Sequence, residues 1–243
     1  MGRIGTIVNR KAKQDSKRAG IFMKLARSIV VAVKEGGADP EYNAALQSAI
    51  EKAKAANMPN DNIERAIKKA SGEGSEEDYF EINYEGYGPG GIAVLVECLT
   101  DNVNRTAGDV RAAFTKARGN LGTTGSASYV FDHVGVLVIE RDGAIDEDTL
   151  MMEALDAGAE DFTAEQEHFE IYTSVADFGH VRDALKEKGY RFSLSELTYL
   201  PKTLQRIEET DTKDMRRLLD TLEDNDDVQN VFSTWDAHHD QDE

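Results

Sequence analysis

Residues 134–200 switch repeatedly between the two hydrophobic periods of regular secondary structure. Short apolar runs and alternation indicate strands, whereas apolar residues at three- and four-residue steps indicate helices. The expected elements are strands 134–140, 160–164, 168–173 and 191–200, and helices 146–157 and 175–188. Their order is β-α-β-β-α-β without a gap over 67 residues, which is the order of a ferredoxin-like domain.

The segments on either side predict the same order once this unit is set aside. They comprise strand 92–99, helix 104–117, strand 126–131, a short strand 204–207, a helix containing Met215, Leu218, Leu219 and Leu222, and strand 228–235. A short β-like segment, 80–84, lies upstream of them. We therefore expect one ferredoxin-like domain to be inserted at a hairpin tip of another, because such tips tolerate insertions.

The chain begins with a different pattern, in which three amphipathic helices follow a polar arm. The first starts near Ser16 and has Phe22, Ile29 and Val33 on one side. We expect the second to start with Asp39 as N-cap and Pro40 in its first turn, and the third to start with a capping box from Asp61 to Glu64. In the same way, Gly119 is expected to end helix 104–117 as its C′ glycine.

These patterns together predict an α+β fold in which an N-terminal three-helix domain precedes two ferredoxin-like α/β domains, one inserted in the other. The expected boundaries are a flexible basic arm at 1–15, a helical domain at 16–78, a ferredoxin-like domain at 79–132 plus 203–235, the inserted domain at 133–202, and an acidic tail at 236–243.

Composition restricts the class of protein. The apolar share of 40% is enough for a packed core, and the longest apolar run, Val134 to Ile139 with Gly135 included, is far shorter than the ~20 residues of a membrane-spanning helix. Cys98 is the only cysteine, which excludes internal disulfides and thiolate zinc sites. The basic N-terminus has no apolar segment of the kind found in secretory signals. We expect a soluble, cytoplasmic protein, with a monomer favoured.

Charge is distributed unevenly along the chain. The net charge is −18, yet residues 1–70 hold 14 Lys and Arg against 7 Asp and Glu, a local charge of +7. This asymmetry favours a basic module for a polyanion, carried by an acidic body. The alternative is that the basic helices dock on their own acidic neighbour.

Catalytic motifs are weak. The segment Gly86–Gly91 lacks the Gly-Lys-Ser/Thr ending of a phosphate-binding loop, so a sharp turn explains its glycines better. No nucleophile with a base and an orienting group can be assembled from the sequence, and the five histidines give no metal-ligand spacing. The residues therefore leave an enzyme possible but point to no catalytic group, and we expect no metal site.

Nucleic-acid binding has more support. Residues 3–27 contain eight bases and one acid, and about six phosphate contacts would give a salt slope near −5. No helix-turn-helix spacing, zinc finger or ribonucleoprotein aromatic motif is present, so sequence-specific readout has no visible apparatus. The expected phosphate-binding residues are Arg3, Arg10, Lys11, Lys13, Lys17, Arg18, Lys24, Arg27, Arg105, Arg111 and Arg118.

Several motifs resemble the YebC/PmpR family, which includes mitochondrial translational activators. They are residues 55–67 (AANMPNDNIERAI), 84–91 (YEGYGPGG), 99–102 (LTDN) with 104–106 (NRT), 119–122 (GNLG), the strand-like 125–131 and the acidic 222–231. The resemblance covers nearly the whole chain. It departs at the start, where Met1–Asn9 stands in place of the family's short segment containing His-Ser-Lys-Trp.

The resemblance implies a helical domain with two α/β domains and a regulator of transcription that binds DNA in the cytoplasm. The family also contains ribosome-associated translation factors, so ribosomal RNA or messenger RNA is the alternative target, with help to elongation at difficult stretches as the role. The resemblance implies no enzymatic activity and no cofactor. The residues alone leave two other classes open: a protein-interaction module whose acidic domains dock basic partners, and an unrecognised hydrolase or nucleotide-binding enzyme.

Overall fold

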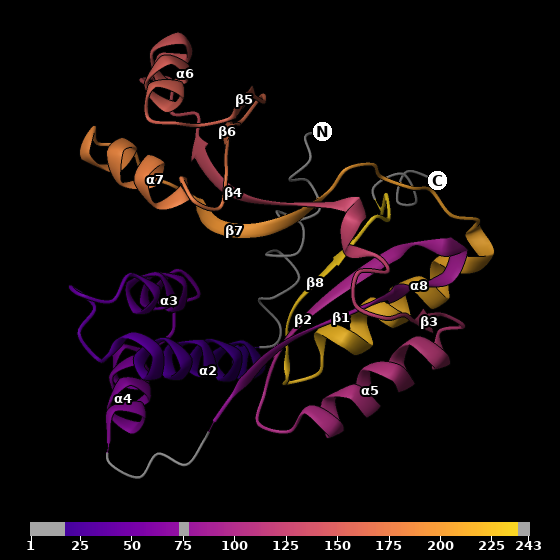
Figure 1. The fold of residues 1–243 in the computed structure, drawn as a ribbon. Helices are drawn as coiled ribbons and strands as arrows, with labels where there is room; N and C mark the ends of the chain where they lie inside the picture. Colours follow the sequence, from indigo (N-terminus) through magenta and orange to yellow (C-terminus); the bar gives the residue numbers. More distant parts are fainter. Residues whose placement is uncertain (1–17, 73–77, 238–243) are drawn as a thin grey trace. The chain divides into compact units, whose positions relative to one another are not determined.

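The computed structural model describes residues 18–72 and 78–237 (Figure 1). They form two compact units: residues 129–203, called here the inserted unit, and the other described residues, the host unit. The expected arm and residues 238–243 of the expected tail lie outside the described residues. Helices and two four-stranded antiparallel sheets together confirm the predicted α+β class. None of the described helices is long and apolar enough to span a bilayer.

Three helices begin the host unit, as the amphipathic patterns predict. They are α2 (Arg18–Gly36), α3 (Ala44–Ala55) and α4 (Asn60–Ser71). Ile29, Leu46 and Ile63, one from each helix, are buried in a common core. Since none of these helices could bury its apolar stripe alone, packing on the other two is what stabilises each of them.

The start of α3 differs from the prediction. Asp39 lies in a turn, and the N-cap is Asn43, whose Oδ1 accepts a hydrogen bond from the Leu46 N–H at 3.0 Å. The Asn43 amide also donates to the carbonyl oxygens of Ala32 at 2.7 Å and Gly37 at 2.8 Å. Asn43 caps α3 because one side chain satisfies the end of α2 and the start of α3 together, which a carboxylate cannot do.

Two further helix ends also differ. The N-cap of α4 is Pro59, so the predicted capping box at Asp61 does not form. After α5, the residue in the left-handed conformation is Arg118 (φ 59°), and the N–H groups of Arg118 and Gly119 bond to the last turn of the helix. Gly119 is needed for another reason, because a Cβ there would lie 2.7 Å from the Tyr87 carbonyl oxygen.

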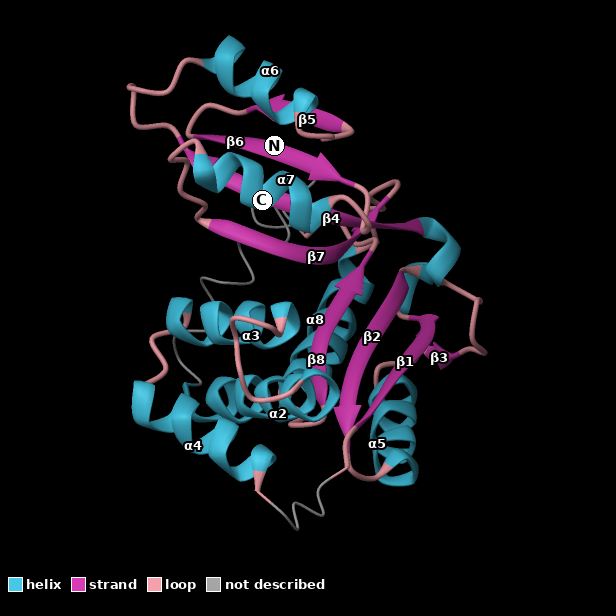
Figure 2. Cartoon of the chain, turned by 60° about the vertical axis from the view of Figure 1, so that its left-hand side comes forward, coloured by secondary structure: helices cyan, strands magenta, loops and turns pink. Residues whose placement is uncertain are grey.

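The host sheet has the strand order β3-β1-β2-β8. Its elements are β1 (Phe80–Tyr87), β2 (Ala93–Thr100), α5 (Val103–Lys116), β3 (Asn120–Leu121), α8 (Glu209–Glu223) and β8 (Val228–Ser233), with short 3₁₀ turns η1 (Pro89–Gly91) and η2 (Ser128–Val130). Helices α5 and α8 share one core with the sheet, formed around Val96, Phe114 and Leu218 (Figure 2).

Two predicted host strands, 126–131 and 204–207, are wrong. The buried carboxylate of Glu85 accepts hydrogen bonds from the N–H groups of Gly125 (2.9 Å), Ala127 (2.8 Å) and Ser128 (2.8 Å). These amides therefore bond to a carboxylate and not to a neighbouring strand, and a 3₁₀ turn follows. Residues 204–207 make only an isolated bridge, Gln205 to Trp235.

The inserted unit follows its predicted element order. It consists of β4 (Phe131–Glu140), α6 (Glu147–Asp156), β5 (Asp161–Ala164), β6 (His168–Thr173), α7 (Phe178–Glu187) and β7 (Leu194–Pro201), with the sheet order β5-β6-β4-β7. The host sheet has the same spatial order, with β1 in the position that β6 occupies here. Both sheets are thus ferredoxin-like, but the host recruits this strand from upstream of its first helix.

Gly86 on β1 and Gly108 on α5 give opposite expectations for substitution by alanine. A Cβ at Gly86 would lie 2.5 Å from the Asn120 oxygen and 2.8 Å from Phe114 Cε1, whereas a Cβ at Gly108 would meet nothing within 4 Å. Gly86→Ala should lower the free energy of unfolding by about 1–3 kcal/mol. Gly108→Ala should raise it by about 0.5–1 kcal/mol, because alanine has the higher helix propensity.

Urea denaturation of both variants and the wild type measures the two changes in the free energy of unfolding. Equal effects of the two substitutions would mean that β1 and β3 do not pack as closely as described.

Candidate nucleic-acid interface

The structure describes the side chains of five of the eleven predicted phosphate-binding residues. Lys24 and Arg27 lie on α2, and Arg105, Arg111 and Arg118 lie on or just after α5. Arg3, Arg10, Lys11, Lys13 and Lys17 lie outside the described residues, and Arg18 begins α2 without a described side chain.

Arg27 and Arg105 meet at one buried carboxylate, that of Asp227, which is 3% exposed. Arg27 Nη1 donates to Oδ1 at 2.7 Å, and Arg105 Nη2 donates to Oδ2 at 2.8 Å. The Thr106 hydroxyl lies 2.8 Å from the same Oδ2. We call Arg27, Arg105, Thr106 and Asp227 the Asp227 junction. It joins α2 of the helical bundle to α5 and to the start of β8.

Local sequence explains why these groups converge. The segment between β2 and α5 is held by Asn102, which caps α5 by accepting from the Arg105 N–H at 3.0 Å and donates its own N–H to Thr100 Oγ1 at 2.9 Å. On the other side, the Leu99 N–H donates to the Asp227 carbonyl oxygen at 2.8 Å. The motif at 99–106 therefore builds a structural junction.

Further bonds from α2 reinforce this docking. Arg27 Nη1 also donates to the carbonyl oxygens of Leu99 at 3.2 Å and Asp226 at 2.8 Å. Lys24 Nζ donates at 2.7 Å to the carbonyl oxygen of Glu223, the last residue of α8, where the helix dipole favours a cation. For Lys24 and Arg27, docking of the basic helices on an acidic neighbour thus accounts for the charge.

The Asp227 junction also shifts the pKa values of Asp227 and Arg105. Burial by itself would raise the pKa of Asp227, but the hydrogen bonds from Arg105, Thr106 and Arg27 outweigh it and hold that pKa below its usual range. The bonds to Asp227 and Asp101 raise the pKa of Arg105 in return. Asp227 is therefore ionised throughout the neutral range.

Arg118 and Arg111 differ in their surroundings. Arg118 donates to Asp214 at 2.7 Å and to Asp211 at 3.1 Å, both on α8, and the Asp214 bond is the main cause of its raised pKa. Arg111 is exposed on α5, and the structure shows no hydrogen bond or ion pair from it to another described residue. Of the five described bases, Arg111 is the one presented to solvent without such a bond.

Sequence reasoning overlooked one set of exposed bases. It lies on α3 and α4, on the side away from Ala53, Ile63 and Ala66, and comprises Lys52, Lys54, Arg65, Lys68 and Lys69. Their spacing relative to the buried stripe could have revealed them, because residues three and four apart share a helix face. The acids Glu51, Asp61 and Glu64 are interspersed among them.

The described residues contain no cluster of metal ligands. No group of three or more His, Cys, Asp or Glu among them could hold a metal ion. The glycine-rich segment Gly86–Gly91 packs against α8 and the residues just before it. A Cβ at Gly88 would lie 2.7 Å from Met215 Sδ, and a Cβ at Gly90 would lie 2.5 Å from Ile207. Close packing therefore explains Gly88 and Gly90, and the positive φ values of Gly90 (67°) and Gly91 (75°) agree with the predicted sharp turn.

Comparisons with known proteins cover nearly all of the chain. Residues 3–73 match the family model described as the TACO1/YebC protein N-terminal domain, and residues 79–235 match the TACO1/YebC second and third domain. A probable transcriptional regulatory protein of Clostridioides difficile is 57% identical over 98% of this chain and 100% of its own length. One of Finegoldia magna is 56% identical over 95% of each chain.

A solved structure is similar as well. The crystal structure of a conserved hypothetical protein from Aquifex aeolicus is 42% identical, has a TM-score of 0.79 and covers 93% of both chains.

Asp227→Asn should lower the free energy of unfolding by about 2–3 kcal/mol. This is less than the ~3–5 kcal/mol typical of breaking a buried ion pair, because the Arg105 side chain is 45% exposed and can be rehydrated. Asp226→Asn is the matched control, since Asp226 is exposed and Arg27 bonds only its backbone oxygen. Thermal or urea unfolding measures both. Equal effects would show that the junction contributes nothing.

The Asp227 junction should also make stability depend on pH. Because the folded-state pKa of Asp227 lies below the unfolded value of about 3.9, its stabilisation is complete above that value and is lost as pH falls through the folded-state pKa. The difference in free energy of unfolding between wild type and Asp227→Asn should therefore be constant near neutral pH and shrink as pH falls below about 5. Urea titrations across this range test it, and a constant difference would contradict it.

Proposed function

This chain belongs to the TACO1/YebC family, and from that premise we propose that it is a non-catalytic regulator of transcription that binds DNA through its N-terminal basic segment. The names of its relatives, probable transcriptional regulatory proteins, support the regulatory role. The proposed location is the cytoplasm, with nucleic acid as the partner and without a cofactor.

The choice of a DNA-binding surface rests on one observation: three of the predicted phosphate-binding arginines already bond carboxylates within the protein. Arg27 and Arg105 bond a buried carboxylate, and Arg118 bonds two carboxylates of α8. To contact phosphate, each would have to exchange an existing partner, so its net contribution to binding would be small. The role then falls to the bases upstream of α2 and to Lys52, Lys54, Arg65 and Lys68, which are exposed on the helical bundle.

The proposed contact set is therefore weighted toward the start of the chain. Residues 1–18 carry six bases and one acid. They are complemented by Arg111 and by Lys52, Lys54, Arg65 and Lys68 of α3 and α4. The six N-terminal bases are Arg3, Arg10, Lys11, Lys13, Lys17 and Arg18.

A mechanism follows from this composition. Lysine and arginine contacts to phosphate release counterions and give affinity that falls with salt, but they carry no sequence information. Any preference among DNA sites would then depend on the shape and deformability of the duplex.

Charge reversal in the basic segment tests the proposal. Lys13→Glu with Arg18→Glu should weaken binding to mixed-sequence duplex DNA and reduce the slope of log K against log[salt] by up to about 2, because each phosphate contact contributes about 0.9. The matched control is Lys186→Glu with Arg191→Glu, which makes the same change in net charge on exposed residues of the inserted unit.

Binding isotherms from about 50 to about 200 mM salt measure the slope. If the two double variants lose affinity equally, overall charge and not the N-terminal segment governs binding. If ribosomes bind at the higher salt while DNA does not, the proposal of DNA as the target is wrong.

A further inference from the structure

Strand β4 has apolar residues on both of its faces. Leu137 and Ile139 point toward α6 and α7, where they share a core with Leu150 and Leu185. Val136 and Val138 point the other way into a second cluster. Strands that read as continuous apolar runs are those covered on both sides, so the run from Val134 to Ile139 requires a cover on each face of the inserted sheet.

The inserted unit's own helices cover only one of these faces (Figure 2). The second cluster, called here the outer-face cluster, nevertheless includes fully buried side chains, with Val136 and Leu200 both 0% exposed. Its members are Val136, Val138, Tyr172, Leu194 and Leu200, with Val134 partly buried beside them.

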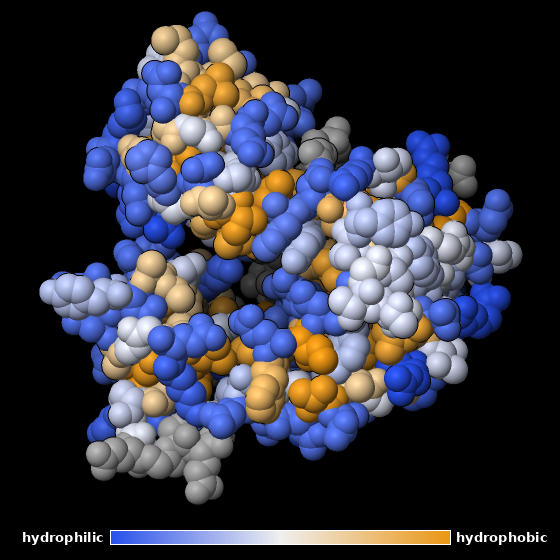
Figure 3. Space-filling model, viewed as in Figure 1, coloured by the Kyte–Doolittle hydropathy of each residue, from blue (hydrophilic) through white to orange (hydrophobic). Residues whose placement is uncertain are grey.

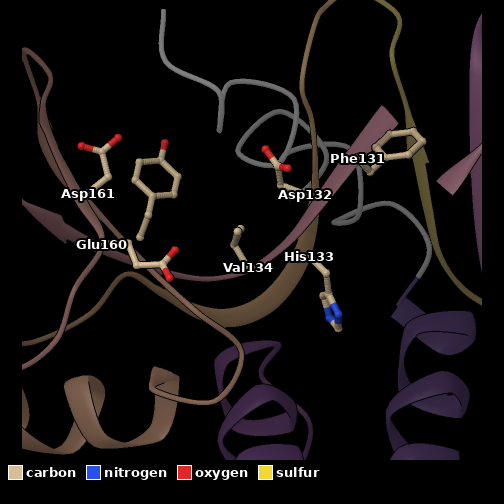
Figure 4. Close-up of a pocket in the computed structure, with 7 residues that line it drawn as sticks. Phe131, Asp132, His133, Val134, Glu160 and Asp161 are labelled. Carbon is tan, nitrogen blue, oxygen red and sulfur yellow. The ribbon is translucent and has the colours of Figure 1, made fainter. Parts of the chain in front are cut away.

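An acidic groove of about 460 Å³ adjoins the outer-face cluster. Figure 4 shows Asp132 and Val134 pointing to one side of β4 and His133 to the other, with the carboxylates of Glu160 and Asp161 near the same groove. The whole inserted unit is acidic, with 17 Asp and Glu against 6 Lys and Arg. A suitable occupant therefore combines apolar side chains with positive charge.

One polar atom on this face also lacks a partner. Thr198 pairs with Val134 across β4 and β7, is 2% exposed, and its hydroxyl makes no hydrogen bond to any described residue. A buried unsatisfied hydroxyl is unfavourable, so an extended backbone or a polar side chain of the occupant would be stabilised here.

Elsewhere on the inserted unit, Figure 3 shows apolar residues reaching the surface at α6 and along β7, where Met152 and Leu197 are exposed.

We propose that the outer face of the inserted sheet is the docking site of the chain's own first residues, Met1–Asn9. Their apolar residues Ile4, Ile7 and Val8 would contact the outer-face cluster, and Arg3 would bind the acidic groove. This contact needs no nucleic acid. It would engage Arg3, one of the six N-terminal bases proposed to contact DNA, and leave that role to Arg10, Lys11, Lys13, Lys17 and Arg18.

The composition of the undescribed segments singles out this occupant. Residues 73–77 (EGSEE) and 238–243 (HHDQDE) are acidic and have no large apolar side chain, so the acidic unit would repel them. Residues 10–17 (RKAKQDSK) are basic but have no large apolar side chain for the outer-face cluster. Residues 1–9 have three aliphatic β-branched residues, one base and no acid. Fifteen positions separate Arg3 from the start of α2 at Arg18, which is a tether of up to about 50 Å at roughly 3.3 Å per residue.

Cysteine cross-linking in the full-length chain tests the proposal. Thr6→Cys is combined with Thr163→Cys, which lies on β5 two residues from Asp161 and so on the same face. The control combines Thr6→Cys with Glu187→Cys, an exposed position at the end of α7. The native Cys98 does not interfere, because it is buried and burial raises its pKa to about 12.

A short bismaleimide should join positions 6 and 163 at least about tenfold more than positions 6 and 187, because docking raises the effective concentration of one pair only. Mass spectrometry of a mixture with isotope-labelled protein separates links within one chain from links between chains. Equal yields, or no link to position 163, would overturn the proposal. Links mainly between labelled and unlabelled chains would also overturn it, by making a second copy the occupant.

Neutralising the groove tests the electrostatic part separately. Asp132→Asn with Asp161→Asn should reduce the 6-to-163 yield several-fold, and so should high salt, since exposed charges are screened over about 10 Å at 0.1 M. A yield that resists both changes would overturn the assignment of Arg3 to the groove.

Discussion

The carboxylate of Asp227 is the point on which the host unit depends. It is almost fully buried, and burial of an unpaired carboxylate is costly. Arg27, Arg105 and Thr106 supply charge and hydrogen bonds that make this burial tolerable. Because Arg27 lies on α2 and Arg105 on α5, one acid fixes the helical bundle against the sheet. Side chains 200 and 122 residues away in the chain meet at it.

This interaction changes how the uneven charge of the chain is understood. An excess of bases in the first 70 residues suggests a surface for polyanions, yet Lys24 and Arg27 bond groups of the same unit. Charge counts cannot separate bases that stabilise the fold from bases that face a partner, since both raise local charge equally. The distinction requires knowing which acids lie within hydrogen-bonding distance. The bonds of Lys24, Arg27, Arg105 and Arg118 within the host unit therefore limit the proposed DNA contact to the N-terminal segment and the exposed bases of the helices.

The two sheets show how one layer architecture arises from two connectivities. In the inserted unit all four strands come in the ferredoxin-like order, so the sequence pattern predicts the sheet directly. In the host unit, β1 takes the position expected for a strand at 204–207. Glu85 on β1 accounts for part of this, because it accepts hydrogen bonds from the amides of Gly125, Ala127 and Ser128, which therefore do not join a sheet.

Sequence by itself determined the local elements and the fold class, because helix and strand periods are properties of neighbouring residues. It therefore predicted the three-helix bundle and the inserted unit, with errors at helix ends such as Asn43 and Arg118. Only the tertiary structure decided the place of β1 and the partners of Arg27, Arg105 and Arg118. Strand pairing and ion pairing join residues distant in the chain, and their energies depend on burial and distance, which no local pattern encodes.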